Sequence, residues 1–204
     1  MVVAADELAL KSLESFGASV RANVRGLWKG VYDDGEFVDG MYSTLLRGYT
    51  QAWNEGAALC GVMPADRTDA EQLELVRMIE TDLSFAPGFA GDIETTDREE
   101  GGKLGPFLTR AELWVNGYNR VRSKAQQMAC GDQKLEWVWD PVKEHCISCE
   151  MLNGRVHRAS VWESFNIQPQ SRYLVCRGFS CGCRFVVTDK PATRGRPPIL
   201  ARGL

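Results

Sequence analysis

The hydrophobic positions of the 204-residue chain follow a helical period up to about residue 130 and a strand period after it. Apolar residues three or four apart predict a first helix within residues 1–30 and a second from Glu36. The first has one apolar face, made by Leu10, Leu13, Gly17, Val20, Val24 and Leu27. The second repeats a large apolar side chain every fourth residue, at Phe37, Met41, Leu45, Tyr49 and Trp53. Asp33-Asp34-Gly35 predicts the turn between them, and Pro64 predicts the end of the second.

A third and a fourth helix are predicted from the same period. Thr68 and Glu71 have the spacing of a capping box, which indicates a helix start at that point. We expect its buried face to consist of Leu73, Val76, Ile79 and Leu83. The glycine-rich, acidic segment from Pro87 to Gly105 is expected to be a loop. The fourth helix is predicted from Phe107 to Ala129, with Thr109 as its N-cap and the buried stripe Ala111, Val115, Tyr118, Val121, Ala125 and Met128.

Beyond the fourth helix the pattern is that of short strands. Leu135, Trp137 and Trp139 alternate with other residues, as in a half-buried strand. Further short strands are expected at 155–157, after a turn at Gly154, at 173–175 and at 183–188. The predicted fold is therefore α+β, with N-terminal helices followed by a long helix packed on a small antiparallel β module. We expect a helical region with its acidic loop at 1–105, the long helix and cysteine-rich module at 106–188, and a tail at 189–204. The basic, proline-rich tail is expected to be extended or disordered unless a partner orders it.

Five of the seven cysteines lie close together in the predicted β module, and their spacing is that of metal ligands. Cys146 and Cys149 form a C-x-x-C pair, and Cys176, Cys181 and Cys183 form a C-x4-C-x-C group. Two such knuckles predict one tetrahedral zinc ion, and four thiolates close the site to water, so the ion would be structural. The five thiols exceed four ligand positions. The favoured set is Cys146, Cys149, Cys176 and Cys181, with Cys183 as the substitute.

The five cysteines could also have roles other than metal binding. They could be buried free thiols or form disulfides, and C-x-x-C could be a redox pair. A redox pair requires the motif to open a helix within a βαβ unit, whereas here it follows a predicted strand. His145 and His157 could bind the ion, but we interpret them as polar residues that lie at the surface or contact the metal ligands without binding the ion. Cys60 and Cys130, near helix ends, are interpreted as packing residues.

Charge and composition narrow the function classes only slightly. The chain is 44% hydrophobic with a net charge of −3, and residues 66–100 hold eleven acidic and three basic residues. Neither a targeting segment nor an apolar run long enough to span a bilayer is recognisable. In a reducing cytosol, clustered cysteines are more often metal ligands than disulfides. Nucleophile-elbow, phosphate-loop and H-E-x-x-H motifs are missing from the sequence, so nothing in it argues for an enzyme, and we expect a protein without enzymatic activity.

Two further groups could suggest function but are interpreted as structural. The acidic residues of the expected loop are taken to be solvated and not a carboxylate site: Asp92, Glu94, Asp97, Glu99 and Glu100. Four tryptophans could stack nucleic-acid bases, yet few basic residues lie among them, so we expect core packing for Trp114, Trp137, Trp139 and Trp162.

With these motifs in hand, the chain resembles the phage minor head proteins of the Mu F-like head-morphogenesis family over residues 45–187. The similarity begins with A-W-x-E-G-A at 52–57, followed by Cys60-Gly61. It continues with T-R-A-E-x-W at 109–114, which runs into the W-x-W strand. It ends with E-H-C-x-x-C, L-N-G-R-V and L-V-C-R-G-x-x-C-x-C.

The family pattern closes with P-x-H-P-x-C-R-C, and this sequence departs from it. Here Cys176 stands where the histidine would, and four residues rather than two separate it from Cys181. A cysteine in place of a histidine preserves a zinc ligand.

The resemblance implies a protein of the procapsid or virion, assembled in the host cytoplasm and present in few copies. Its implied partners are the portal protein, the major capsid protein or both, and neither a membrane nor a small-molecule substrate. Its implied roles are head assembly, DNA packaging or genome delivery. The basic tail, which lies beyond the resemblance, is expected from its charge to reach packaged DNA or an acidic patch of a neighbour. Two alternatives remain: a zinc-ribbon nucleic-acid-binding protein, and an enzyme with an open zinc or a module of a polymorphic toxin. The segments outside the resemblance are too short, and too ordinary in sequence, to form a convincing toxin domain.

Overall fold

The computed structural model describes residues 2–96, 101–140, 144–171, 173–178 and 181–198. Contacts divide the chain into two units. Unit 1 comprises Met1–Gln51 and Gln72–Tyr118, and unit 2 comprises Ala52–Glu71 and Asn119–Leu204. Each unit is therefore built from two separate stretches of sequence. The three regions expected from the sequence, 1–105, 106–188 and 189–204, remain a prediction about functional parts.

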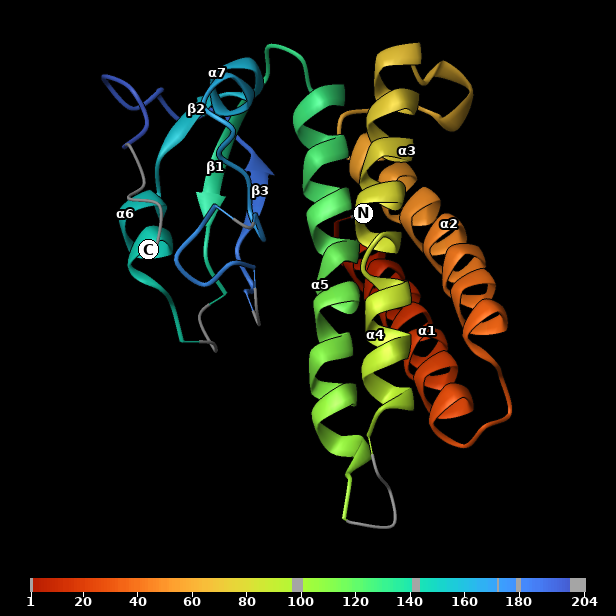
Figure 1. The fold of residues 1–204 in the computed structure, drawn as a ribbon. Helices are drawn as coiled ribbons and strands as arrows, with labels where there is room; N and C mark the ends of the chain where they lie inside the picture. The colour runs from red at the N-terminus through yellow and green to blue at the C-terminus, as the bar shows by residue number, and fades with distance from the viewer. Residues whose placement is uncertain (1, 97–100, 141–143, 172, 179–180, 199–204) are drawn as a thin grey trace. The chain divides into compact units, whose positions relative to one another are not determined.

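Long helices account for most of the first 129 residues (Figure 1). They are α1 (Val2–Trp28), α2 (Asp34–Ala58), α3 (Asp69–Leu83), α4 (Ala86–Glu94) and α5 (Leu104–Ala129), with a short 3-10 helix η1 (Pro64–Asp66) before α3. The four predicted helices are confirmed. The helices of the described part are too short or too polar to cross a membrane.

The sequence explains where α2 and α3 begin. The Asp33 carboxylate accepts the N–H of Glu36 at 2.8 Å, and the Glu36 carboxylate accepts the N–H of Asp33 at 3.0 Å. Thr68 and Glu71 form the same reciprocal pair at the start of α3, with the N–H of Thr68 donating to the Glu71 carboxylate at 2.8 Å. Each pair satisfies backbone N–H groups that a helix start leaves without partners.

The predicted apolar faces of α1, α2 and α5 are largely the buried ones. Every member of the α2 stripe is fully buried: Phe37, Met41, Leu45, Tyr49 and Trp53. In α5, residues Ala111 to Ala125 of the predicted stripe are buried. Within residues 10–28 of α1, whose burial is described, the buried part begins at Phe16, whereas Leu10 is 55% exposed. Burial of these side chains supplies most of the driving force for the helices to pack.

The predicted buried face of α3 is largely wrong, since Ile79 alone of its four residues is buried. Leu73 is 72% exposed, whereas the buried residues are Glu71, Leu75, Met78, Ile79 and Asp82. The buried residues follow the helical period, but two of them, Glu71 and Asp82, are acidic. A prediction that counts apolar residues alone therefore selects a different face of the helix. Asp82 is acceptable in the interior because the Tyr49 hydroxyl donates to its carboxylate and the Trp114 indole N–H donates to its carbonyl at 2.9 Å.

The expected loop from Pro87 to Gly105 is also wrong in part, because α4 occupies its first half and α5 begins at Leu104. The buried residues of α4 are Ala86, Phe89, Ala90 and Ile93, a helical spacing. Pro87 lies in the first turn, where its missing N–H costs nothing. Thr109 lies inside α5 and is not its N-cap. The glycines and acids of this segment obscured its short apolar period.

Unit 2 contains a three-stranded antiparallel sheet in the order β2-β1-β3 (Figure 1). Its strands are β1 (Lys134–Val138), β2 (Val156–Arg158) and β3 (Arg184–Val187), and two short helices, α6 (Ile147–Leu152) and α7 (Ala159–Ser164), lie between them in sequence. In the register, Leu135 is opposite His157 and Trp137 is opposite Phe185. The predicted alternation of β1 is confirmed, since Leu135 and Trp137 are buried.

The second half of α5 packs on this module, as the sequence predicted. Ser123 donates a hydrogen bond to Gln170 at 3.1 Å, and Gln127 donates to the carbonyl of Ile167 at 3.1 Å. Three buried aromatic residues of the module core contact one another: Trp137, Trp162 and Phe185. The core role expected for Trp114, Trp137 and Trp162 is confirmed by their burial, whereas Trp139 is half-buried and packs against the module core.

The strand expected at 173–175 is wrong, whereas the expectation for the tail stays a prediction. Residues 173–175 form turns instead of a strand, because only Leu174 enters the core while Tyr173 and Val175 are about half exposed. The tail contains neither helix nor strand over its described part, 189–198, and it contacts β2. The N–H of Thr193 donates to the carbonyl of Val156 at 2.8 Å, and Pro197 is buried. The end of the tail, 199–204, lies outside the described residues.

Cys60 and Cys130, expected to be separate packing residues, form a disulfide. Their Cα atoms are 5.1 Å apart across a sequence separation of 70 residues. Cys60 lies in the turn after α2, and Cys130 lies directly after α5. Periodicity cannot indicate such a pairing, because it depends on the tertiary contact between the ends of two helices.

Candidate metal centre

The first cysteine pair lies at the start of α6. Cys146 is the N-cap residue of this helix, and Cys149 lies in its first turn. The C-x-x-C motif therefore opens a helix, contrary to the setting expected from the sequence. The sheet beside it is antiparallel throughout its described strands, so the βαβ unit of a redox motif is not formed there. A turn of this kind points both sulfur atoms to the same side, as a metal knuckle requires.

The second group comes from the segment between α7 and β3. Cys176 lies in a turn after Leu174, and Cys183 immediately precedes β3. Cys149, Cys181 and Cys183 are buried, whereas Cys146 and Cys176 are half-buried. The buried thiols belong to one apolar cluster with Trp137, Trp162 and Phe185. The two knuckles, far apart in sequence, thus meet at the core of unit 2.

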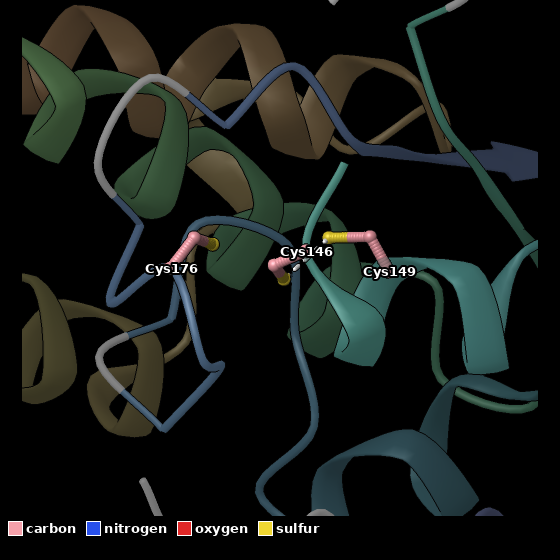
Figure 2. A group of neighbouring side chains, drawn as sticks. All are labelled: Cys146, Cys149 and Cys176. Carbon is pink, nitrogen blue, oxygen red and sulfur yellow. Dashed lines mark hydrogen bonds between the residues drawn. The ribbon is translucent and has the colours of Figure 1, made fainter. Parts of the chain in front are cut away.

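The sulfur atoms form two groups of three that share Cys149. One group is Cys146, Cys149 and Cys176, and the other is Cys149, Cys181 and Cys183; within each, the sulfurs lie within 4.8 Å of one another. Figure 2 shows the first group with its side chains turned toward a common point. Cys149 Sγ is 3.5 Å from that of Cys146 and 3.9 Å from that of Cys181. Four thiolates around a tetrahedral ion at about 2.3 Å would have their sulfurs about 3.8 Å apart.

All five predicted cysteines therefore belong to one cluster that can hold a metal ion. Cys181 and Cys183, between which the sequence could not decide, lie in the same group. Which four would bind a single ion stays a prediction. The donor set consists of thiols alone, which favours soft or borderline ions such as zinc over calcium and magnesium.

Hydrogen bonds already favour negative charge at particular sulfurs. Burial alone raises the pKa of Cys146, but the backbone amides of Cys149 and Cys176 and the thiols of the same residues outweigh it, and the pKa is lowered. Hydrogen bonds from the thiols of Cys149, Cys176 and Cys183 lower the pKa of Cys181. A cation that bound there would displace the protons of those thiols into solvent, since thiolates are the metal-binding form.

Residues outside the cysteine motifs hold the two knuckles together. The hydroxyl of Ser148, inside C-x-x-C, accepts the N–H of Val175 at 3.1 Å, next to Cys176. The Gln170 amide donates to the carbonyls of Cys181, at 3.3 Å, and Cys183. Gln170 is 4% exposed and has a positive φ of 58°. Sequence analysis missed both residues, because neither lies on an apolar period and their partners are distant in sequence.

Glycine is required between Cys181 and Cys183. A Cβ atom at Gly182 would lie 2.6 Å from the Cβ of Asp140, so a larger residue would force either Asp140 or the chain that carries the two ligands to shift. The C-x-C spacing with a central glycine thus has a packing reason in addition to its chemistry.

Neither histidine belongs to the sulfur groups found among the described residues. His145 stacks on Trp139 with ring centroids 4.5 Å apart. His157 is 4% exposed and meets the edge of Trp162, and burial, followed by the charge of Arg155, lowers its pKa. His157 is therefore a neutral core residue. It was expected to lie at the surface or to contact the metal ligands.

A groove in unit 1 is a weaker candidate site. Its volume is about 400 Å³, and Lys11 and Arg47 lie at its wall together with hydroxyl groups of α1 and α2. None of its lining residues within the described part of the chain is acidic, so an anion would fit. Its charged groups are exposed, whereas the thiols of the metal centre are largely buried and converge.

Comparisons with protein families, with curated proteins and with solved structures found no match to this chain.

Proposed function

We propose that the cysteine cluster binds one structural zinc ion and that the chain is a non-enzymatic minor capsid protein of a phage head, associated with the portal or the inner shell. The zinc assignment is carried by one observation, the convergence of five thiols from two distant knuckles on a buried core. The head assignment is carried by the resemblance to Mu F-like proteins.

Zinc suits this cluster for chemical reasons. Its d10 shell imposes no geometry, and thiolates at mutual distances near 3.5–3.9 Å, as for Cys149 with Cys146 and Cys181, fit tetrahedral coordination. Four of the five sulfurs would close the site to water, and the fifth would remain a neighbouring thiol. Residues Cys146, Cys149, Cys176 and Cys181 would hold the ion, with Cys183 as the substitute.

The need for such an ion follows from the small size of the secondary structure in this part of unit 2. The strands have three to five residues and α6 and α7 have six each. Short elements bury little apolar surface, and a metal ion then supplies folding free energy directly. This supports a structural role for the ion.

Exposed apolar side chains on the helices support a docking role. Tyr42 and Leu46 lie one turn apart on α2, and both are more than 40% exposed. Leu73 is exposed on α3 in the same way. These side chains are not needed for the core of unit 1, so they are available for a protein partner such as the portal.

Metal analysis tests the zinc assignment. The purified protein should contain about one zinc per chain, and Cys146→Ser should lose most of it, since binding and folding are coupled. Cys60→Ser is the matched control, because Cys60 lies outside both sulfur groups, and it should retain the ion. An intact fold without metal would remove the zinc proposal.

The head assignment requires a separate test. Mass spectrometry of purified particles of the encoding phage should detect the chain at a few copies relative to the major capsid protein. A portal gene beside its own gene would support the same conclusion. Detection only in the host-cell lysate, never in particles, would contradict it.

A nucleic-acid-binding protein is the second candidate, and exposed arginines of unit 2 favour it. Among the described residues they include Arg177, Arg184, Arg194 and Arg196. This candidate predicts that the isolated protein binds DNA with an affinity that falls steeply with salt. The head-protein proposal predicts little binding away from the particle.

A further inference from the structure

The disulfide between Cys60 and Cys130 is chemically separate from the metal centre. Neither cysteine belongs to the two groups of sulfur atoms that can hold an ion among the described residues. The bond joins the segment Ala52–Glu71 to the remainder of unit 2, and it closes a loop that contains the second sequence stretch of unit 1.

The two cysteines are brought together by helix packing and do not depend on the bond for their proximity. A Cβ atom at Gly56 in α2 would lie 2.9 Å from the carbonyl carbon of Arg122 and 3.0 Å from the Cβ of Ala125 in α5. The absence of a side chain at Gly56 therefore allows the two backbones to touch within unit 2. Such contact keeps the two thiols at a high effective concentration in the reduced state.

In the reduced state the Cys60 thiol also has a hydrogen-bond acceptor. Cys60 Sγ lies 3.9 Å from the carbonyl oxygen of Gln126, which can accept the S–H. Cys130 is 4% exposed and lies in the apolar cluster, where a neutral thiol is well accommodated. Both redox states are thus compatible with the same packing.

The two sulfurs differ in access. Cys60 is half-buried and lies in the turn after α2, beside Leu59, which is 40% exposed, and Gly61, whose Cβ position is open. Cys130 is buried. Thiol–disulfide exchange requires a thiolate to reach a sulfur atom, so access decides which sulfur is attacked.

We propose that Cys60 and Cys130 form a reversible thiol–disulfide site in which Cys60 is the sulfur attacked by low-molecular-weight thiols such as glutathione. A glutathione thiolate bonds to Cys60 Sγ, the bond to Cys130 breaks, and Cys130 leaves as a thiolate that takes a proton from water. A second glutathione thiolate attacks the glutathione sulfur of the mixed disulfide, which releases oxidised glutathione and the Cys60 thiolate. Oxidised glutathione reverses both steps. This inference does not depend on the proposed function.

Two single variants test the direction of attack. Zinc-loaded, full-length Cys130→Ser and Cys60→Ser proteins are treated with oxidised glutathione and analysed by mass spectrometry. Cys130→Ser should carry a single glutathione, mapped to Cys60. Cys60→Ser, in which only the buried Cys130 remains of the pair, should carry none. Zinc content should be unchanged in both.

Equal modification of the two variants, modification confined to Cys60→Ser, or loss of zinc in step with the adduct would overturn the proposal. The wild-type protein gives the same answer if a variant fails to fold. Acid quenching during its reduction by glutathione should trap the mixed disulfide on Cys60, and trapping on Cys130 would contradict the inference.

Discussion

Gln170 contacts three residues of unit 2 through one buried side chain. Its amide oxygen accepts from Ser123 of α5, and its amide nitrogen donates to the carbonyls of Cys181 and Cys183. A residue with this position supports the metal ligands without binding the ion. Removal of such supporting groups typically weakens metal binding by about 10–100-fold.

Gln170→Ala should therefore weaken zinc binding by roughly tenfold or more, measured by competition with a chromophoric chelator. Gln168→Ala is the control, because Gln168 lies two residues away and makes none of these side-chain bonds in the described structure. An equal effect of the two substitutions would show that Gln170 has no special role.

His157 makes stability depend on pH through its burial. Its pKa in the folded protein lies below the ordinary value of about 6.5, so the unfolded chain takes up a proton that the folded chain resists. The contribution of neutral His157 is complete above about pH 6.5 and is lost as the pH falls below it. His157→Asn should remove this dependence.

The measurement is the free energy of unfolding of wild type and His157→Asn between pH 8 and pH 5, about 6.5 being the expected turning point. The advantage of the wild type should shrink as the pH falls, while acid release of zinc affects both proteins alike. A difference that stays constant, or grows in acid, would contradict the account of His157.

At the scale of the elements, α4 is the clearest example of what the sequence concealed. Its buried face has a helical spacing, but its glycines and the acids that follow make the whole segment resemble a loop. The face of α3 was mistaken because Glu71 and Asp82 are buried through hydrogen bonds, which a count of apolar residues ignores. By contrast, α2 and β1 were predictable, since their core positions are filled by large apolar side chains alone.

The metal centre was predictable to a similar degree. The cysteine spacing is local to each knuckle, and it is that of metal ligands, so the sequence indicated that the two knuckles would meet. The sharing of Cys149 between two groups of sulfurs was not predictable, since it depends on the path of the segment before β3. The support from Ser148 and Gln170 likewise follows from tertiary contacts alone.

A pair of glycine substitutions tests the helices directly. Gly88→Ala should stabilise the protein by up to about 1 kcal/mol, because Gly88 lies in α4 and no atom lies within 4 Å of the new Cβ. Gly56→Ala should destabilise it by about 1–3 kcal/mol, because the new Cβ would overlap the backbone of Arg122. Chemical denaturation measures both. Destabilisation by Gly88→Ala would contradict the assignment of α4 as a helix.

At the scale of the whole molecule, two different cross-links act within unit 2. The disulfide closes a loop of 70 residues, for which chain entropy predicts about 4 kcal/mol of stabilisation. The metal ion would join the two cysteine knuckles. Reduction should therefore lower the unfolding temperature of the wild type without releasing zinc, and it should have no such effect on the double variant Cys60→Ser/Cys130→Ser. Zinc release on mild reduction would show that the cross-links are not independent.

X-ray absorption at the zinc edge of the purified, zinc-containing protein tests the metal centre most directly. The account predicts a first shell of four sulfur atoms at about 2.3 Å with no nitrogen or oxygen ligand. A shell with nitrogen or oxygen in place of a sulfur, or a folded protein that binds no zinc at all, would contradict it.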